Sequence, residues 1–188
     1  MEASCGGRSV TRVVGIDPSL TGTGLATITS TDGPAVRVIS SEPTPDPTLI
    51  DRDMRLELIV HAVETVAAGA DLAVIEGPAL GKASPHTWER AGLWWRIVNR
   101  LIARQVPLAV CPPTVRAKWA TGKGNAGKAP VVAAIARMWP DVELVDDNAA
   151  DALVFATMGA QRVGLAVPLA RHRDALASVE WPAALQAA

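Results

Sequence analysis

The amino-acid sequence predicts an α/β fold in which a five-stranded mixed sheet carries helices on both faces. Three short segments near the start of the chain are β-branched or alternate between apolar and polar residues, and turn sequences separate them. This pattern is typical of an antiparallel meander. Short apolar segments then alternate with segments of helical periodicity, which indicates further strands covered by helices.

The first three strands are expected at residues 13–16, 22–30 and 35–40. The first strand should end at Asp17-Pro18, because proline has no N–H to donate to a strand ladder. The turn sequences SLTGTG and TDGP separate the three strands. The stretch SSEPTPDPT contains three prolines and is expected to form a loop.

Helices and buried strands alternate after this loop. A first helix is expected to begin behind Asp51 or Asp53, with apolar residues at helical spacing as far as Ala67 and Gly69 as its C′ residue. The other elements are expected at residues 72–75 (strand), about 85–104 (helix), 108–110 (strand), 114–120, 128–139 and about 147–163 (helices). The order of elements is therefore βββ-α-β-α-β-α-α-α.

The length of 188 residues suits one domain. We expect residues 1–11 to be a frayed tail, residues 12–163 to form the domain, and residues 164–188 to form a C-terminal extension with a possible further helix. No apolar run reaches the roughly 18 residues that a membrane span requires. Two cysteines cannot build a disulfide framework, so a cytoplasmic location is expected.

Acidic residues occur where a core strand or helix would normally be apolar. Asp17 and Glu76 end buried strands, Asp151 lies in the apolar stretch AADALVFA, and Asp147 is one helical turn before it. Burying carboxylates is unfavourable unless a cation neutralises them, and carboxylate oxygens suit Mg²⁺ or Mn²⁺. Each acid also has a structural interpretation: a turn at Asp17, an arginine partner for Glu76, or helix capping by Asp146, Asp147 or Asn148.

The positive charges are strongly clustered although the net charge is only −1. Residues 82–137 contain ten basic residues and one acid, Glu89. This asymmetry predicts one face that meets a polyanion such as DNA. The candidate DNA contacts are the residues expected in loops or at helix starts: Lys82, Arg90, Arg116, Lys118, Lys123 and Lys128. Three further arginines, Arg96, Arg100 and Arg104, are expected to be a solvated helix face.

Five of the six tryptophans lie in or just beyond this basic stretch. Trp88 and Trp119 are candidates for stacking on unpaired bases. Trp94, Trp95 and Trp139 are expected in the core or in a dimer contact, because apolar residues flank them. The segment ERAGLWWRIVNRLIA is apolar on more than one side as a helix, which predicts a homodimer.

Three motifs in order, VVGIDPSLTGTGLATI, AVIEGP and DDNAADALVFA, resemble those of the RuvC-type Holliday junction resolvases of the RNase H-like superfamily. The resemblance spans about residues 12–163. It implies an RNase H-like fold and a dimeric, metal-dependent endonuclease that resolves four-way DNA junctions by paired symmetric nicks. The implied mechanism is in-line phosphodiester hydrolysis with two Mg²⁺ ions per site, for which Mn²⁺ can substitute.

The resemblance also implies roles for individual residues. Asp17, Glu76 and Asp151 match the catalytic, metal-binding acids. The fourth ligand of the family is an Asp or His at the position of Asn148; we favour the neighbouring Asp147, with Asn148 as the alternative. Arg116 and Lys128 match basic positions near the scissile phosphate, and Lys128 is included among the catalytic residues. The aromatic residue that family members carry after the strand-four glutamate is replaced by Ala79, so Trp88 is the candidate wedge.

Two other functions remain open at this point. A YqgF-like RNA-processing nuclease would share the metal site and act on another polymer. A branched-DNA-binding module without catalysis would be consistent with Asn148 in place of an acid. An actin-like ATPase starts with a similar first motif but needs a duplicated domain, for which 188 residues leave no room.

Overall fold

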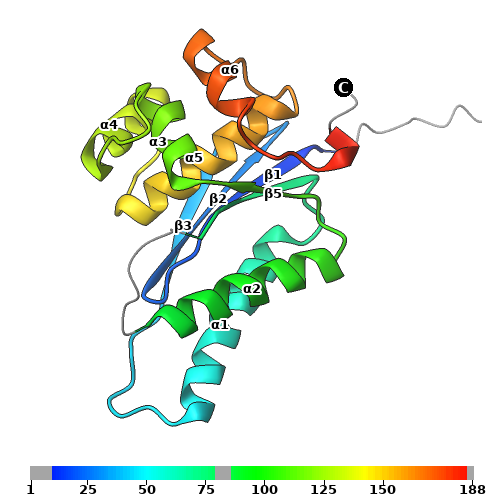
Figure 1. The fold of residues 1–188 in the computed structure, drawn as a ribbon. Helices are drawn as coiled ribbons and strands as arrows, with labels where there is room; N and C mark the ends of the chain where they lie inside the picture. The colour runs from blue at the N-terminus through cyan, green and yellow to red at the C-terminus, as the bar shows by residue number, and fades with distance from the viewer. Residues whose placement is uncertain (1–9, 79–85, 186–188) are drawn as a thin grey trace, which may run out of the picture.

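A five-stranded sheet in the order β3-β2-β1-β4-β5 forms the centre of the structure (Figure 1). The computed structural model describes residues 10–78 and 86–185. The strands are β1 (Arg12–Asp17), β2 (Gly22–Thr29), β3 (Ala35–Ser40), β4 (Leu72–Glu76) and β5 (Leu108–Cys111). Strand β2 pairs antiparallel with β1 and β3, whereas β4 pairs parallel with β1 and β5. The predicted meander and mixed sheet are confirmed.

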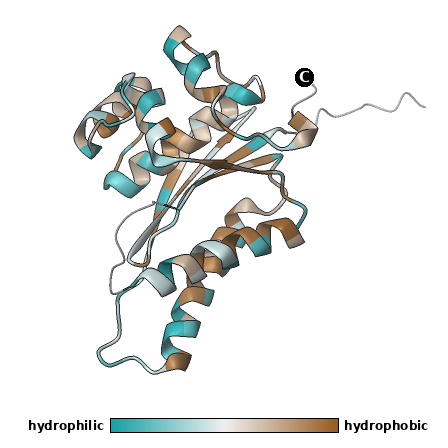
Figure 2. Ribbon diagram, in the orientation of Figure 1, coloured by the Kyte–Doolittle hydropathy of each residue, from teal (hydrophilic) through white to brown (hydrophobic). Residues whose placement is uncertain are grey.

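Helices cover both faces of the sheet, as predicted (Figure 1). Helices α1 (Leu49–Ala67) and α2 (Thr87–Ala103) lie on one face. The other face carries α3 (Pro113–Thr121), α4 (Lys128–Met138) and α5 (Asp147–Arg162), and α6 (Ala170–Leu176) packs against α3. The strands between the two layers are largely hydrophobic (Figure 2).

Alternation along the strands divides the core between the two helical layers. In β1, Val14 and Ile16 pack in the cluster with α1 and α2, whereas Val13 packs in the cluster with α3 to α5. In β4, Ile75 faces the α1–α2 layer and Val74 faces the α5 layer. Because side chains alternate, the last residues of both strands face the α5 layer.

The start of α1 differs from the prediction. Thr48 is the N-cap: its hydroxyl accepts a hydrogen bond from the Asp51 N–H, and the Asp51 carboxylate accepts one from the Thr48 N–H. Asp51 is therefore the third helical residue of a capping box, and neither Asp51 nor Asp53 starts the helix. At the other end, Gly69 follows the C-cap with φ of +69°, as expected for a C′ glycine.

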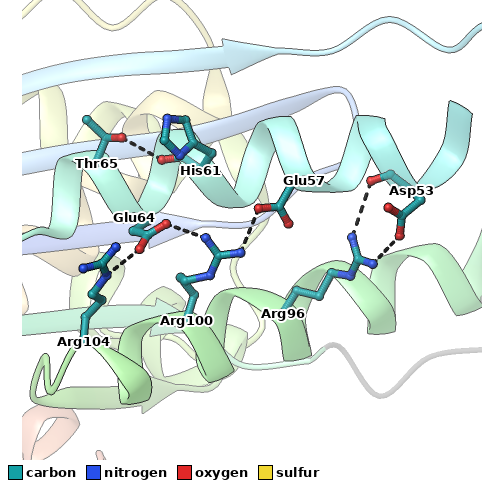
Figure 3. A network of polar contacts seen from close by, with 8 residues as sticks. All are labelled: Asp53, Glu57, His61, Glu64, Thr65, Arg96, Arg100 and Arg104. Atoms are coloured by element: carbon teal, nitrogen blue, oxygen red, sulfur yellow. Dashed lines mark hydrogen bonds and ion pairs between the residues drawn. The ribbon is translucent and has the colours of Figure 1, made fainter. Parts of the chain in front are cut away.

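The arginines of α2 form ion pairs with α1, and they are not the simply solvated face that we expected (Figure 3). Arg100 donates to Glu57 at 2.7 Å and to Glu64 at 2.5 Å, and Arg104 donates to Glu64 at 2.5 Å. Arg96 pairs with Asp53 one turn further along. These contacts tie α1 to α2, so the positive charge of α2 is largely neutralised within the protein.

The C-terminal extension folds back onto the sheet. It forms the short helix α6, and Glu180 makes an isolated antiparallel bridge with Val110 of β5. Arg162 at the end of α5 donates to the carbonyl of Leu185 and lies over the Trp181 ring. The extension therefore covers part of the β5 edge. None of the described helices combines the length and hydrophobicity that crossing a membrane would require.

Candidate active site

Two of the predicted site residues lie side by side at the exit of the parallel strand pair. Ile16 of β1 pairs with Ile75 of β4, so Asp17 and Glu76 are the next residues on neighbouring strands. Both side chains face the α5 layer because of the alternation described above. Asp17 is buried, and Glu76 is mostly buried. Two carboxylates therefore meet at one edge of the sheet.

A third carboxylate reaches this edge because α5 packs directly on the backbone of the sheet. A Cβ on Gly15 would overlap with the Ala152 carbonyl, and a Cβ on Gly24 would overlap with the Asn148 carbonyl. Glycine at these two positions lets the helix approach more closely than any other residue would permit. This close approach brings the buried Asp151 near Asp17, which pairs with Gly24 in the sheet.

The electrostatics of the three acids show how closely they interact. Burial, repulsion by Glu76 and Asp151, and a hydrogen bond with Glu76 raise the pKa of Asp17 to about 9. Burial also raises the pKa of Asp151 to about 6, although Arg116 opposes that increase. Burial and nearby like charges both disfavour the ionised form of a carboxyl group, as they do for Asp17 and Asp151. The three acids therefore form one electrostatic unit.

Arg116 is the cation that this unit contacts. Its Nη1 pairs with Asp151 and lies 2.9 Å from Glu76 Oε1, and the Arg116 side chain is only 13% exposed. Glu76 therefore has an arginine partner, Arg116, which is the structural alternative that the sequence left open for it. Arg116 was predicted as a DNA contact; in the structure it is turned into the carboxylate site.

The start of α5 separates the roles of its polar residues. Asp146 is the N-cap, and its carboxylate accepts a hydrogen bond from the Ala149 N–H at 2.8 Å. Asp147 pairs with Lys128 at the start of α4, and this pair lowers the pKa of Asp147. The Asn148 amide lies 3.5 Å from the Asp146 carboxylate. The two candidates for a fourth ligand thus have different surroundings, and only Asp147 is charge-paired.

The residues fit a divalent cation by their chemistry, although their present arrangement is not a closed cage. Asp17, Glu76 and Asp151 supply oxygen donors whose mutual repulsion a cation would relieve. Glu76 Oε1 is buried without a hydrogen-bond partner. Across residues 10–78 and 86–185, no three Asp, Glu, His or Cys side chains are grouped so that they could hold a metal ion as they stand. Arg116 stands among the acids instead.

The predicted DNA contacts divide into three groups. The first group is exposed, as a DNA contact requires: it includes Trp88, which is 87% exposed at the start of α2. The basic residues of this group are Arg90, Lys118, Lys123 and Lys128. Lys82 lies outside the described residues. Trp119 cannot stack on a base, contrary to our expectation: it is 1% exposed, donates to Gln161 Oε1 at 2.9 Å and stacks on His172. Its contacts with α5 and α6 bury it.

Two supporting residues were not predicted. The Trp94 indole donates to the Glu76 carbonyl at 2.8 Å, which links α2 to the exit of β4. Arg55 of α1 donates to the carbonyls of Leu20 and Ser41 at 2.6 and 2.7 Å, and so fixes the turn that follows Asp17. The sequence marked Trp94 only as apolar-flanked, and no motif marked Arg55.

Comparison with known proteins identifies the fold. No protein-family model and no curated protein sequence matches the chain. The structure is similar to that of Thermus thermophilus RuvC, with a TM-score of 0.62 and 20% identity over 85% of this chain and 100% of that chain. It is also similar to T. thermophilus RuvC in complex with a Holliday junction substrate, with a TM-score of 0.64 and 19% identity over 85% and 99% of the two chains. The chain therefore has the RuvC-type, RNase H-like fold.

Proposed function

We propose that this protein is a metal-dependent endonuclease that resolves four-way DNA junctions by paired symmetric nicks. The observation that carries the proposal is the convergence of Asp17, Glu76 and Asp151 from β1, β4 and α5. This convergence occurs in a fold shared with a RuvC solved together with a Holliday junction. The known fold and the acidic site thus support the same activity.

In this proposal the three acids, together with Asp147 or Asn148, hold two Mg²⁺ or Mn²⁺ ions. When bound, such ions activate a water molecule and stabilise the leaving oxygen of an in-line displacement. Asp17 would contribute to holding them from the central strand β1, Glu76 from β4 and Asp151 from α5. Gly24 lets the start of α5 contact the backbone of β2 directly. Because Gly24 pairs with Asp17 in the sheet, this contact keeps Asp151 close to Asp17.

Exposed basic and aromatic side chains would bind the DNA. Lys128 is exposed next to Asp147, and Lys118 and Lys123 are exposed on α3 and the loop that follows it. Such side chains neutralise phosphates and release counterions. Trp88 is exposed and free to stack on an unpaired base at a branch point. Arg90 is exposed on the same helix and adds a further charge.

A homodimer would supply the two active sites that symmetric nicking needs. Two large apolar residues on α2, Trp95 and Ile102, are exposed and lie seven residues apart. On α1, Ile50, Met54 and Leu58 are exposed at intervals of four. Stripes of this spacing are typical of helices that pack against another helix. Light scattering should therefore give twice the chain mass, and W95S should lower it toward the monomer.

A non-catalytic module that binds branched DNA is the second candidate. Two observations favour it: Arg116 already neutralises two of the acids, and the described acids do not form a metal cage as they stand. An RNA-processing nuclease of the YqgF type would use the same site on another polymer. The three candidates differ in which substrate is cut and in whether anything is cut.

One experiment separates them. The purified protein is incubated with a labelled four-way junction, a duplex of the same sequence and a hairpin RNA, with Mg²⁺, Mn²⁺ or EDTA. We expect paired nicks in the junction only, and only with a divalent ion. D17N should bind the junction without cutting it, whereas D32N, the same change in an exposed turn, should cut normally. Cutting of the RNA alone, or junction binding with no cutting by the unmodified protein, would overturn the proposal.

A further inference from the structure

Arg116 lies between two carboxylates from different elements. Its guanidinium pairs with Asp151 of α5 and lies 2.9 Å from Glu76 Oε1 at the end of β4. Asp17, the third acid, is close enough to Arg116 for its pKa to be lowered by the guanidinium charge, against the larger effects of burial and repulsion. One side chain from α3 thus places a positive charge against two of these acids, while Lys128 of α4 pairs with the neighbouring Asp147.

The pairing of Arg116 is incomplete. Its Nε is buried without a hydrogen-bond partner, and so is Glu76 Oε1, because the 2.9 Å contact lacks hydrogen-bond alignment. By contrast, the Nε and Nη2 of Arg55 donate to Ser41 and Leu20 at 2.6–2.9 Å. A buried ion pair stabilises a fold only when its geometry is good and the remaining polar atoms are bonded. Arg116 therefore neutralises both acids, but only Asp151 holds it by a hydrogen bond.

We propose that Arg116 is an exchangeable counter-cation: it holds Glu76 and Asp151 in the metal-free protein and releases them when divalent ions bind. The released guanidinium is then available to a DNA phosphate. This inference rests on the proposed function, because it takes Glu76 and Asp151 as metal ligands. It assigns Arg116 a positioning role in loading the site, in addition to any contact with DNA.

Electrostatics gives the exchange a direction. A guanidinium and a divalent ion repel each other when both lie within a few ångströms of the same oxygens in a poorly solvated site. A nearby phosphate attracts the guanidinium and can bind it through two hydrogen bonds. DNA should therefore help Arg116 to leave the carboxylates. By linkage, divalent ions and DNA must then strengthen each other's binding by the same factor.

Metal binding without DNA tests the first half of the proposal. Free Mn²⁺ is measured by electron paramagnetic resonance during titration of the full chain, so the readout does not depend on activity. We expect R116Q to bind Mn²⁺ roughly tenfold more tightly than the unmodified protein, within the usual range of coupling between sites. R116K should lie between them, because lysine cannot bridge two carboxylates as arginine does. R96Q, which removes the same charge on α2, should leave Mn²⁺ affinity unchanged.

The outcomes of this titration are distinguishable. If R116Q binds Mn²⁺ with unchanged affinity while the unmodified protein cuts junctions, Arg116 does not compete with the metal and this inference fails alone. If neither protein binds Mn²⁺, the proposed metal-dependent function fails as well. Circular dichroism checks folding, and if R116Q does not fold, an unchanged Mn²⁺ affinity of R116K overturns the inference.

Duplex binding tests the second half, because a plain duplex supplies phosphates and is not the proposed substrate. Its affinity is measured by fluorescence anisotropy with and without Mn²⁺ at constant ionic strength. Mn²⁺ should increase the duplex affinity of the unmodified protein and of R96Q by a factor at least about fivefold larger than it does for R116Q. Equal gains in all three proteins would show that Arg116 does not couple the two ligands.

Discussion

The indole N–H of Trp94 donates a hydrogen bond to the main-chain carbonyl of Glu76 at 2.8 Å. Trp94 belongs to α2, whereas Glu76 is the last residue of β4, so this bond joins the α1–α2 layer to the strand exit that carries a site carboxylate. The neighbouring Trp95 meets Trp94 edge-to-face but is largely exposed. Of these two adjacent tryptophans, Trp94 therefore points into the protein and Trp95 points toward the solvent.

Replacing Trp94 tests the importance of this bond. W94F keeps a large ring but removes the donor, so we expect the free energy of unfolding to fall by about 1 kcal/mol. Under the proposed function, cleavage of a four-way junction should slow severalfold, because the hydrogen bond that holds the Glu76 main chain is lost. Denaturant unfolding and single-turnover cleavage measure the two effects. W95F is the matched control and should leave the cleavage rate per folded chain unchanged.

Replacing Gly24 tests the close contact between β2 and α5. In G24A the new Cβ would overlap with the Asn148 carbonyl, so the start of α5 has to move away from the sheet. We expect the free energy of unfolding to fall by roughly 1–3 kcal/mol, as is typical of overpacking. The rate of the proposed cleavage should also fall, because Asp151 moves with the helix. G33A lies in open space and should affect neither. Normal cleavage by G24A would mean that the site tolerates this displacement.

His172 makes stability depend on pH. The ring is fully buried between Trp119 and Gln161, and burial together with the Arg171 charge lowers its pKa from 6.5 to about 4. Below pH 6.5 the unfolded chain binds a proton that the folded chain does not, so the free energy of unfolding should decrease as the pH falls toward 4.

The size of this decrease should be roughly 2–3 kcal/mol, since one pKa unit corresponds to about 1.4 kcal/mol. Denaturant unfolding at several pH values between 7 and 4 measures it. The H172N variant should be less stable at neutral pH but should lose this part of the pH dependence. H61N, a change at an exposed histidine of α1, should retain it.

Glu64 is the buried centre of the ion-pair network between α1 and α2 (Figure 3). It accepts hydrogen bonds from both Arg100 and Arg104, and these lower its pKa. E64Q should therefore lower the melting temperature by several degrees at pH 7, and more than E57Q, because the half-exposed Glu57 accepts from Arg100 alone.

The sign of the pH effect follows from the lowered pKa. The stabilisation by Glu64 is complete above its usual value of 4.5 and is lost as the pH falls through the lower folded-state value. The difference in melting temperature between E64Q and the unmodified protein should shrink in acid. A constant difference would show that the network does not act through the Glu64 charge.

Much of the architecture is local in origin and could be predicted from the sequence. The alternating segments of the meander, the stop at Asp17-Pro18 and the C′ glycine at residue 69 depend on a few neighbouring residues each. The parallel pairing of β1 with β4 follows from an intervening helix, and it places Asp17 beside Glu76. The assignment of Thr48 as N-cap was missed because three polar candidates stand within six residues.

Contacts between distant segments were decided by the tertiary structure alone. The sequence shows that Arg116 is basic, but only the packing of α3 against α5 turns it toward carboxylates 40 and 35 residues away. Contacts with distant segments likewise bury Trp119 and pair the arginines of α2 with acids of α1. Hydrophobic periodicity and turn chemistry specify which elements form, whereas the direction of a long polar side chain depends on which partners the folded chain brings within a few ångströms.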